Sequence, residues 1–98
     1  MGQSLKSAVF LMESRIAAAS DGDGDALYEL GVAYSTGACG TEVDYIEAHK
    51  WFNLAALNGN GRAQESRAEV ADYMTAREIA EAQRQARSWL AATVRRAA

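Results

Sequence analysis

The chain contains no proline, and that absence limits its fold more than any other feature of the sequence. Proline interrupts helices, whereas alanine has the highest helix propensity and supplies 21 of the 98 residues. The β-branched residues never form a sustained alternating run, which is the pattern of a half-buried strand. The sequence therefore predicts an all-α fold, and its length predicts a single domain over residues 1–98.

Five helices are predicted from apolar residues that recur at spacings of three and four. In the first, Val9, Met12, Ile16 and Ala19 share one face, and in the fourth the apolar stripe is the weakest of the set. Such helices, joined by short turns, predict a stack of α-hairpins or a fragment of a solenoid. The predicted ranges are 4–19, 24–36, 44–58, 61–73 and a long fifth helix that starts after residue 75.

The predicted helix ends depend on capping residues. Asp23 or Asp25 can accept the free N–H groups that open the second helix, and Gly37 ends it. The segment 38–43 is too polar and too short to form an element. Asn58 and Gly59 favour a left-handed stop after the third helix. Two capping boxes are also predicted, at Asp44/Glu47 and Thr75/Glu78.

Gly31 lies in the middle of the second predicted helix. A glycine there costs about 1 kcal/mol relative to alanine, so close approach of a neighbouring helix is the expected gain. The third helix places Trp51 and Phe52 on its apolar face, and we expect both rings and Tyr34 to lie in the core.

Charge and cysteine content restrict the partners and the compartment. Residues 1–60 carry 3 Lys or Arg against 8 Asp or Glu, a net of −5, whereas 61–98 carry 7 against 5, a net of +2. An acidic chain with few lysines argues against nucleic acid as a partner. The single cysteine excludes a disulfide framework, and no stretch is long and apolar enough for a membrane. We therefore expect a cytoplasmic protein.

The segment ALYELGVAYSTG at 26–37 and the residues that follow it resemble the Sel1-like repeat, a relative of the tetratricopeptide repeat. Beyond residue 60 the pattern weakens, because Arg67, Ala68 and Ala71 stand where Leu, Gly and Tyr would recur. The segment 76–90 looks like the helix that closes many bacterial Sel1-like proteins. The positions that carry the resemblance are Ala26, Leu30, Gly31, Tyr34, Gly37, Asp44, Ala48, Trp51, Ala55, Ala56 and Gly59.

The resemblance implies a short α/α solenoid with an N-terminal helix at 4–19, a repeat at 22–59 and terminal helices at 60–98. It also implies a scaffold, adaptor or regulatory partner rather than an enzyme, which is an argument from fold alone.

Residues with possible chemistry have simpler explanations in the sequence. Asp21, Asp23 and Asp25 resemble the start of a calcium loop, but the loop's glycine and final glutamate are missing. His49 and Cys39 could form a thiol or metal site if they met, although we expect His49 on the surface of a helix and Cys39 in a loop. We therefore predict no catalytic residue, no metal and no cofactor.

Two surfaces are candidates for binding another protein or a peptide. Tyr28, Val32 and Ser35 are expected on the face of the second helix that points away from the repeat core. Trp89, beside Leu90 on the last helix, either packs back on the stack or is presented to a partner, since tryptophan is enriched at interface hot spots.

These surfaces lead to three functional hypotheses. The leading one is a cytoplasmic adaptor or regulatory scaffold. The second is a structural protein that self-associates into a homodimer or larger oligomer, because a solenoid usually needs about three repeats and this chain has little more than one. The third is a small metal- or thiol-dependent enzyme built on His49 and Cys39.

Overall fold

The computed structural model describes residues 2–97, with side chains from residue 7 onwards except those of 8 and 95–97. Within these residues the fold is all-α and contains no strand. The helices lie close to the predicted ranges except for the fourth, and a short 3-10 turn separates the second from the third. The elements are α1 (Gly2–Ser20), α2 (Gly24–Thr36), η1 (Ala38–Gly40), α3 (Tyr45–Leu57), α4 (Ala63–Ala71) and α5 (Ala76–Ala97).

Two local predictions need correction. The segment predicted to have no element contains η1, whose central residue Cys39 has φ 59. Helix α4 is shorter than the predicted 61–73, because the Asn60 side chain accepts the Arg62 N–H at 3.0 Å and holds a turn before the helix begins. At its other end, the Tyr73 N–H bonds the Val70 carbonyl and turns the chain toward α5.

The two predicted capping boxes form differently. At α5 the box is reciprocal: the Glu78 N–H donates to Thr75 Oγ1 at 3.1 Å, and the Thr75 N–H donates to Glu78 Oε1 at 2.8 Å. At α3 only half of it forms, with Asp44 accepting from the Glu47 N–H at 3.1 Å. The Asp44 N–H donates instead to the Tyr34 carbonyl at 2.9 Å, so the Glu47 carboxylate is free for other contacts.

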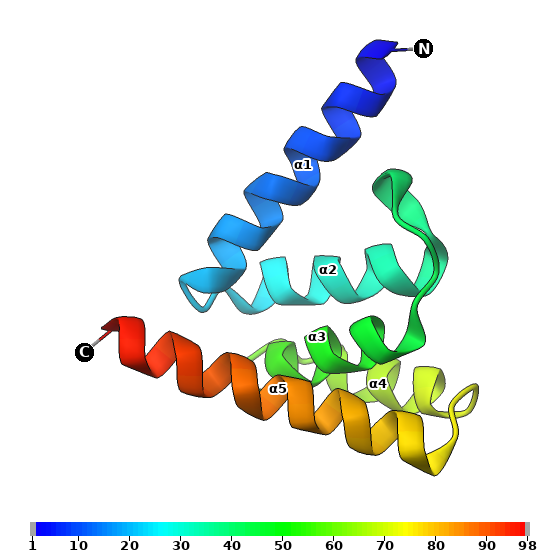
Figure 1. The fold of residues 1–98 in the computed structure, drawn as a ribbon, viewed down its shortest axis with the longest axis vertical. Coiled ribbons are helices and arrows are strands. Elements are labelled where there is room, and N and C mark those ends of the chain that lie inside the picture. Colours follow the sequence, from blue (N-terminus) through cyan, green and yellow to red (C-terminus); the bar gives the residue numbers. More distant parts are fainter. Residues whose placement is uncertain (1, 98) are drawn as a thin grey trace.

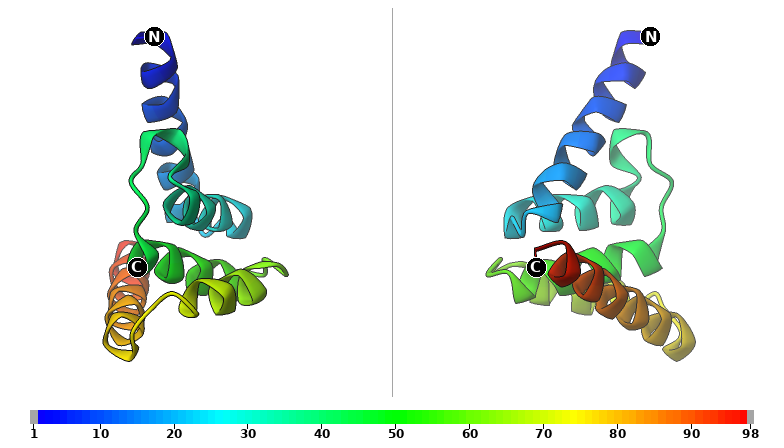
Figure 2. Two further views of the ribbon diagram at one scale, coloured as in Figure 1. Left: turned by 90° about the vertical axis from the view of Figure 1, so that its right-hand side faces the viewer. Right: turned by 60° about the vertical axis from the view of Figure 1, so that its left-hand side comes forward.

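Helix α3 is the centre of the arrangement. Helix α2 packs above it, and α4 and α5 pack on its two sides (Figures 1 and 2). The two flanking helices scarcely touch each other, so the underside of α3 lies between them. Helix α1 contacts α2 at its C-terminal end, while its N-terminal half projects away from the other helices.

Close packing of α2 on α3 explains the glycine in the middle of α2. A Cβ atom at Gly31 would lie 2.5 Å from two atoms of the Phe52 ring, well inside contact distance. The adjacent Leu30 and the facing Ala48 and Ala55 are each 0% exposed. Gly37 and Gly59 have φ values of 78° and 88°, as the predicted helix stops require.

Candidate protein-binding surface

Tyr28 and Val32 do not face away from the core, which corrects the sequence prediction. The Tyr28 ring packs against Phe52 with centroids 5.4 Å apart, and the Arg62 guanidinium lies 4.7 Å from its centroid. Val32 packs against the cluster that contains Phe52. The prediction assumed that only one face of α2 is covered, but α3 and the start of α4 cover it from two directions. The Ser35 hydroxyl, half-buried, donates to the Val32 carbonyl of its own helix.

Trp89 is half-buried on α5 and contacts the core through Trp51. The two indoles meet edge to face, with centroids 4.9 Å apart and planes at 80°. The rest of Trp89 forms part of the wall of a cleft of about 340 Å³ between α3 and α5. Trp89 therefore packs back on the helix stack and also presents part of its ring in the cleft, so both arrangements predicted for it occur together. The cleft is lined by Lys50, Arg84, Gln85, Ser88, Trp89 and Ala92.

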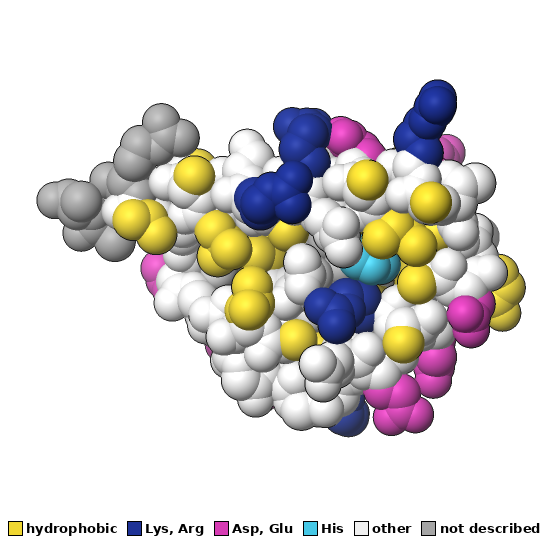
Figure 3. Space-filling view, turned by 90° about the horizontal axis from the view of Figure 1, so that it is seen from below, with side chains coloured by type: hydrophobic (Ala, Val, Ile, Leu, Met, Phe, Trp, Pro, Cys, Tyr) yellow, Lys and Arg dark blue, Asp and Glu magenta, His cyan; other side chains and the backbone are white. Residues whose placement is uncertain are grey.

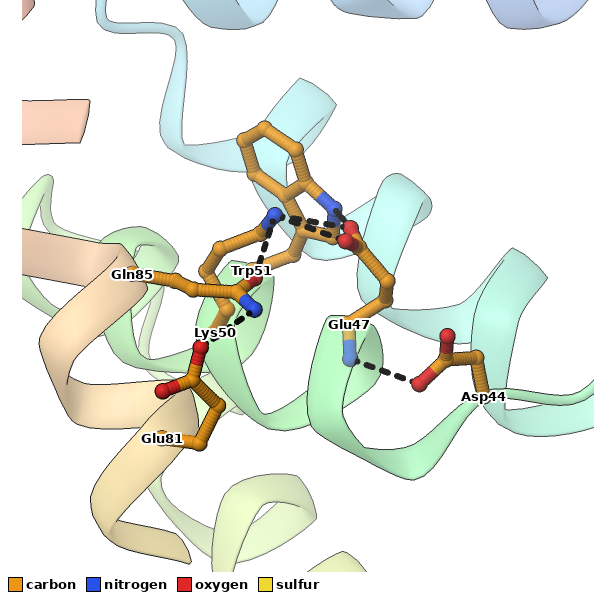
Figure 4. A network of polar contacts seen from close by, with 6 residues as sticks. All are labelled: Asp44, Glu47, Lys50, Trp51, Glu81 and Gln85. Carbon is orange, nitrogen blue, oxygen red and sulfur yellow. Dashed lines mark hydrogen bonds and ion pairs between the residues drawn. The ribbon is translucent and has the colours of Figure 1, made fainter. Parts of the chain in front are cut away.

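A polar network forms the edge of this cleft nearest α3 (Figure 4). Lys50 Nζ lies 2.8 Å from Glu47 Oε2 and donates to Gln85 Oε1 at 3.2 Å. The Trp51 Nε1–H donates to Glu47 at 2.9 Å. Glu47 thus orients both the Lys50 ammonium and the Trp51 indole. The ammonium also lies 4.7 Å from the centroid of the Trp51 ring.

Arg84 and Glu81 continue the polar edge along α5. The Arg84 guanidinium donates to Glu81 at 2.8 Å, and Gln85 donates to the same carboxylate at 3.2 Å. These hydrogen bonds, first from Arg84 and then from Gln85, lower the pKa of Glu81 to about 2. The cleft therefore combines an indole wall with a rim of cations held in place by carboxylates.

His49 is buried, which corrects its predicted place on the surface. Its exposed fraction is 4%, and its Nδ1 atom has no hydrogen-bond partner among the described residues. Burial, together with the positive charge of Arg67, lowers the pKa of His49, so the imidazole is neutral at pH 7. The histidine lies on the underside of the molecule among hydrophobic side chains (Figure 3). The sequence does not reveal this burial, because it depends on the helices that flank α3.

Cys39 lies in η1, which packs against α1, whereas His49 lies on α3. Its Sγ atom accepts a hydrogen bond from Arg15 Nη1 at 3.2 Å, and Arg15 also lies 3.5 Å from Glu29. Within the part of the chain that the structure describes, no three His, Cys, Asp or Glu side chains are grouped as metal ligands.

The aspartates between α1 and α2 serve local structure. Asp23 accepts the N–H groups of Asp25 and Ala26 at 3.0 and 3.2 Å and caps α2. The Asp25 carboxylate accepts from Asn60 at 2.9 Å and ties the start of α2 to the turn after α3.

Among the described residues, no helix has the length and apolar character needed to cross a membrane.

The comparisons with known proteins agree with this geometry. Residues 24–60 match the family model of the Sel1 repeat, from the first residue of α2 to the turn after α3. No curated protein and no solved structure matches the chain. Sel1 repeats are generally modules for protein interaction and are typically not catalytic. Over residues 24–60, which contain the α2–α3 hairpin, the chain is therefore similar to a Sel1 repeat.

Proposed function

We propose that this protein is a cytoplasmic adaptor or regulatory scaffold that binds a segment of a partner protein in the cleft between α3 and α5. The observation that carries the proposal is the half-buried Trp89 in the wall of that cleft. Indole rings supply large contact areas at interfaces and are enriched among hot-spot residues. The cytoplasmic location is supported by the single cysteine, which suits a reducing compartment.

The lining of the cleft indicates the chemistry of the partner. Its volume of about 340 Å³ suits one or two side chains rather than a large ligand. An apolar side chain would lie against Trp89, while Ser88 and Gln85 offer hydrogen bonds to a peptide backbone. At the edge of the cleft, Lys50 is paired with Glu47 and Arg84 with Glu81, so this edge favours polar, uncharged groups on the partner.

A change at Ala92 tests this proposal without altering the core. Ala92 is exposed and lines the cleft, so Ala92→Arg fills the binding volume and adds a positive charge. Ala80→Arg is the matched control, because Ala80 is exposed on the same helix outside the cleft. Each purified variant is compared with the wild type by quantitative affinity capture from extract of its native cell.

We expect one protein to be enriched by the wild type and by Ala80→Arg, and lost by at least about tenfold with Ala92→Arg. A segment of that protein should then bind the isolated chain in titration calorimetry. Equal capture by all three chains would show that the cleft is not the binding site. Turnover of a substrate by the purified chain alone would overturn the adaptor function.

A further inference from the structure

Three successive turns of α3 face α4 and the turn that follows it. Tyr45, His49 and Asn53 follow one another at spacings of four, so they lie on one side of α3. The Tyr45 ring stacks on that of Tyr73, just after α4, with centroids 5.4 Å apart. Asn53 Oδ1 accepts from Arg67 Nη1 of α4 at 2.8 Å. The first and third of these residues are therefore paired across the contact, and His49 lies between them.

His49, the middle residue, is buried in this contact without a polar partner at one ring nitrogen. It is 4% exposed, and its Nδ1 atom has no hydrogen-bond partner among the described residues. The preceding residue, Ala48, belongs to the apolar cluster that also contains Phe52 and Val70 of α4. A neutral imidazole tolerates such surroundings, whereas the protonated form would bury a charge whose Nδ1–H has no acceptor.

The charged groups around His49 do not compensate for a proton. Arg67 of α4 is the group whose positive charge acts on the imidazole, and it opposes a second cation there. Among the described residues of α2, α3, α4 and α5, every carboxylate is either exposed or bonded elsewhere. Those bonded elsewhere are Asp25 to Asn60, Glu29 to Arg15, Glu47 to Lys50, Glu78 to Thr75 and Glu81 to Arg84. The other charged side chains described on α4 and α5 or capping α4 are exposed: Arg62, Glu65, Glu69, Asp72, Arg77 and Arg87.

Helix α4 is held weakly beyond its first turn. It spans 9 residues, too few for a helix that is stable alone, and two of its residues are buried. Its start is tied to α2, because the Arg62 guanidinium lies 4.7 Å from the Tyr28 ring centroid. The later contacts, through Arg67 and Tyr73, are with the face of α3 that carries His49. Residues 67–73 can therefore leave α3 while the start of α4 stays in place.

We propose that the contact between α3 and residues 67–73 is an acid-sensitive switch, which opens when His49 takes up a proton. The protonated imidazole is stable only where water reaches it, so proton uptake favours the open form. Opening uncovers part of the apolar cluster around Phe52 and Val70. The proposal does not rest on the adaptor function, because the cleft at Trp89 lies between α3 and α5.

The rest of the fold stays packed when this contact opens. Helix α5 is anchored on α3 by the edge-to-face contact of Trp89 with Trp51 and by the hydrogen bond from Lys50 to Gln85. Neither contact involves α4. The opening is thus a local event, distinct from unfolding of the whole chain.

Amide hydrogen exchange followed by NMR tests the switch on the intact chain. Rates are measured at about pH 7.5 and about pH 5.5, divided by the intrinsic rate at each pH, and repeated at several low urea concentrations. We expect the amides of residues 67–74 to exchange through an opening that depends little on urea, unlike the core amides of α2. Their protection should fall by about three- to tenfold at the lower pH, because His49 in the open form has the ordinary histidine pKa of about 6.5.

Two variants assign this loss of protection to the buried imidazole. His49→Gln keeps a polar side chain that does not titrate, so protection of residues 67–74 should become independent of pH. The matched control combines His49→Gln with Ala68→His, which restores one histidine at an exposed position of α4. It should also show no loss of protection at the lower pH. Each variant is compared with itself at the two pH values, so a general change in stability does not affect the result.

Three results would overturn the proposal. The first is equal urea dependence for residues 67–74 and the core of α2, which would mean that α4 separates only when the whole chain unfolds. The second is a local opening that is equally frequent at both pH values, which would mean that His49 stays covered in it. The third is a loss of protection at low pH that persists in His49→Gln or in its combination with Ala68→His. The first two are measured on the wild type and do not depend on the folding of a variant.

Discussion

Gly31 and Phe52 set the distance between the two helices of the repeat. Alanine at position 31 would have the better helix propensity, by about 1 kcal/mol. It would also place a Cβ atom 2.5 Å from the Phe52 ring, a fully packed side chain that is 2% exposed. Overpacking in such a place costs more than the propensity gains, which explains a glycine in mid-helix.

We predict that Gly31→Ala lowers the free energy of unfolding by about 1–3 kcal/mol, because α2 and α3 must separate or Phe52 must leave its position. Urea denaturation followed by circular dichroism measures the change. Gly61→Ala is the control, since a Cβ atom there has no neighbour within 4 Å. We expect its effect to stay within about 0.5 kcal/mol, and an equal loss in both variants would contradict the steric explanation.

Individual residues also show where the local sequence was not enough to predict the position of a side chain. Asp23, Gly37 and Thr75 act as predicted, because each acts on backbone groups within a few residues of itself. His49 and Tyr28 do not lie as predicted, because their burial depends on helices that are distant in sequence.

At the scale of the helices, α5 packs against the repeat along a narrow strip of small side chains. Ala82 and Ala86 are 0% and 1% exposed, so the helix approaches α3 closely along small side chains. Among the described residues, the one contact between aromatic rings of α5 and α3 is that of Trp89 with Trp51. The contact between the two indoles therefore defines the position of α5 on α3 more specifically than the small alanine side chains can.

We predict that Trp51 and Trp89 are energetically coupled by about 0.5–1.5 kcal/mol, the usual range for an edge-to-face pair. A double-mutant cycle with Trp51→Phe and Trp89→Leu, measured by urea denaturation, gives the coupling energy. Trp89→Leu combined with Val70→Ala is the control, because Val70 belongs to the other core cluster. Additive effects in the indole pair would mean that α5 does not depend on this contact.

Helix α4 shows how tertiary contacts adjust a helix. The sequence predicts 61–73, whereas the helix spans Ala63–Ala71. Asn60, 8% exposed, bonds Asp25 across the repeat as well as Arg62 beside it, so the turn before α4 belongs to the packing of α2. Helical periodicity cannot report such a bond between distant residues.

At the scale of the whole molecule, the buried histidine links stability to pH. His49 has a lowered pKa in the folded protein, from burial first and from Arg67 second, so the unfolded chain binds this proton more readily. Below the ordinary histidine pKa of about 6.5, protonation therefore favours the unfolded state. The contribution is fully present above that pH and is lost as the pH falls through it.

We predict that the free energy of unfolding decreases between about pH 7.5 and pH 5.5, a range that leaves the carboxylates ionised. Urea denaturation at several pH values measures the slope. In His49→Gln, which keeps a polar side chain but does not titrate, the slope should largely disappear. A slope that persists in the variant would assign the pH dependence to other groups.

The sequence alone determined the all-α fold, the helix ends other than those of α4, and the repeat at residues 24–60. These properties follow from backbone propensity, from caps and from glycine, all of which act over one or two turns of chain. Only the tertiary structure decided that His49 and Val32 are covered, and that Trp89 both packs on Trp51 and borders a cleft. Such properties depend on which helices flank α2 and α3, and one amphipathic helix does not specify how many neighbours will cover it.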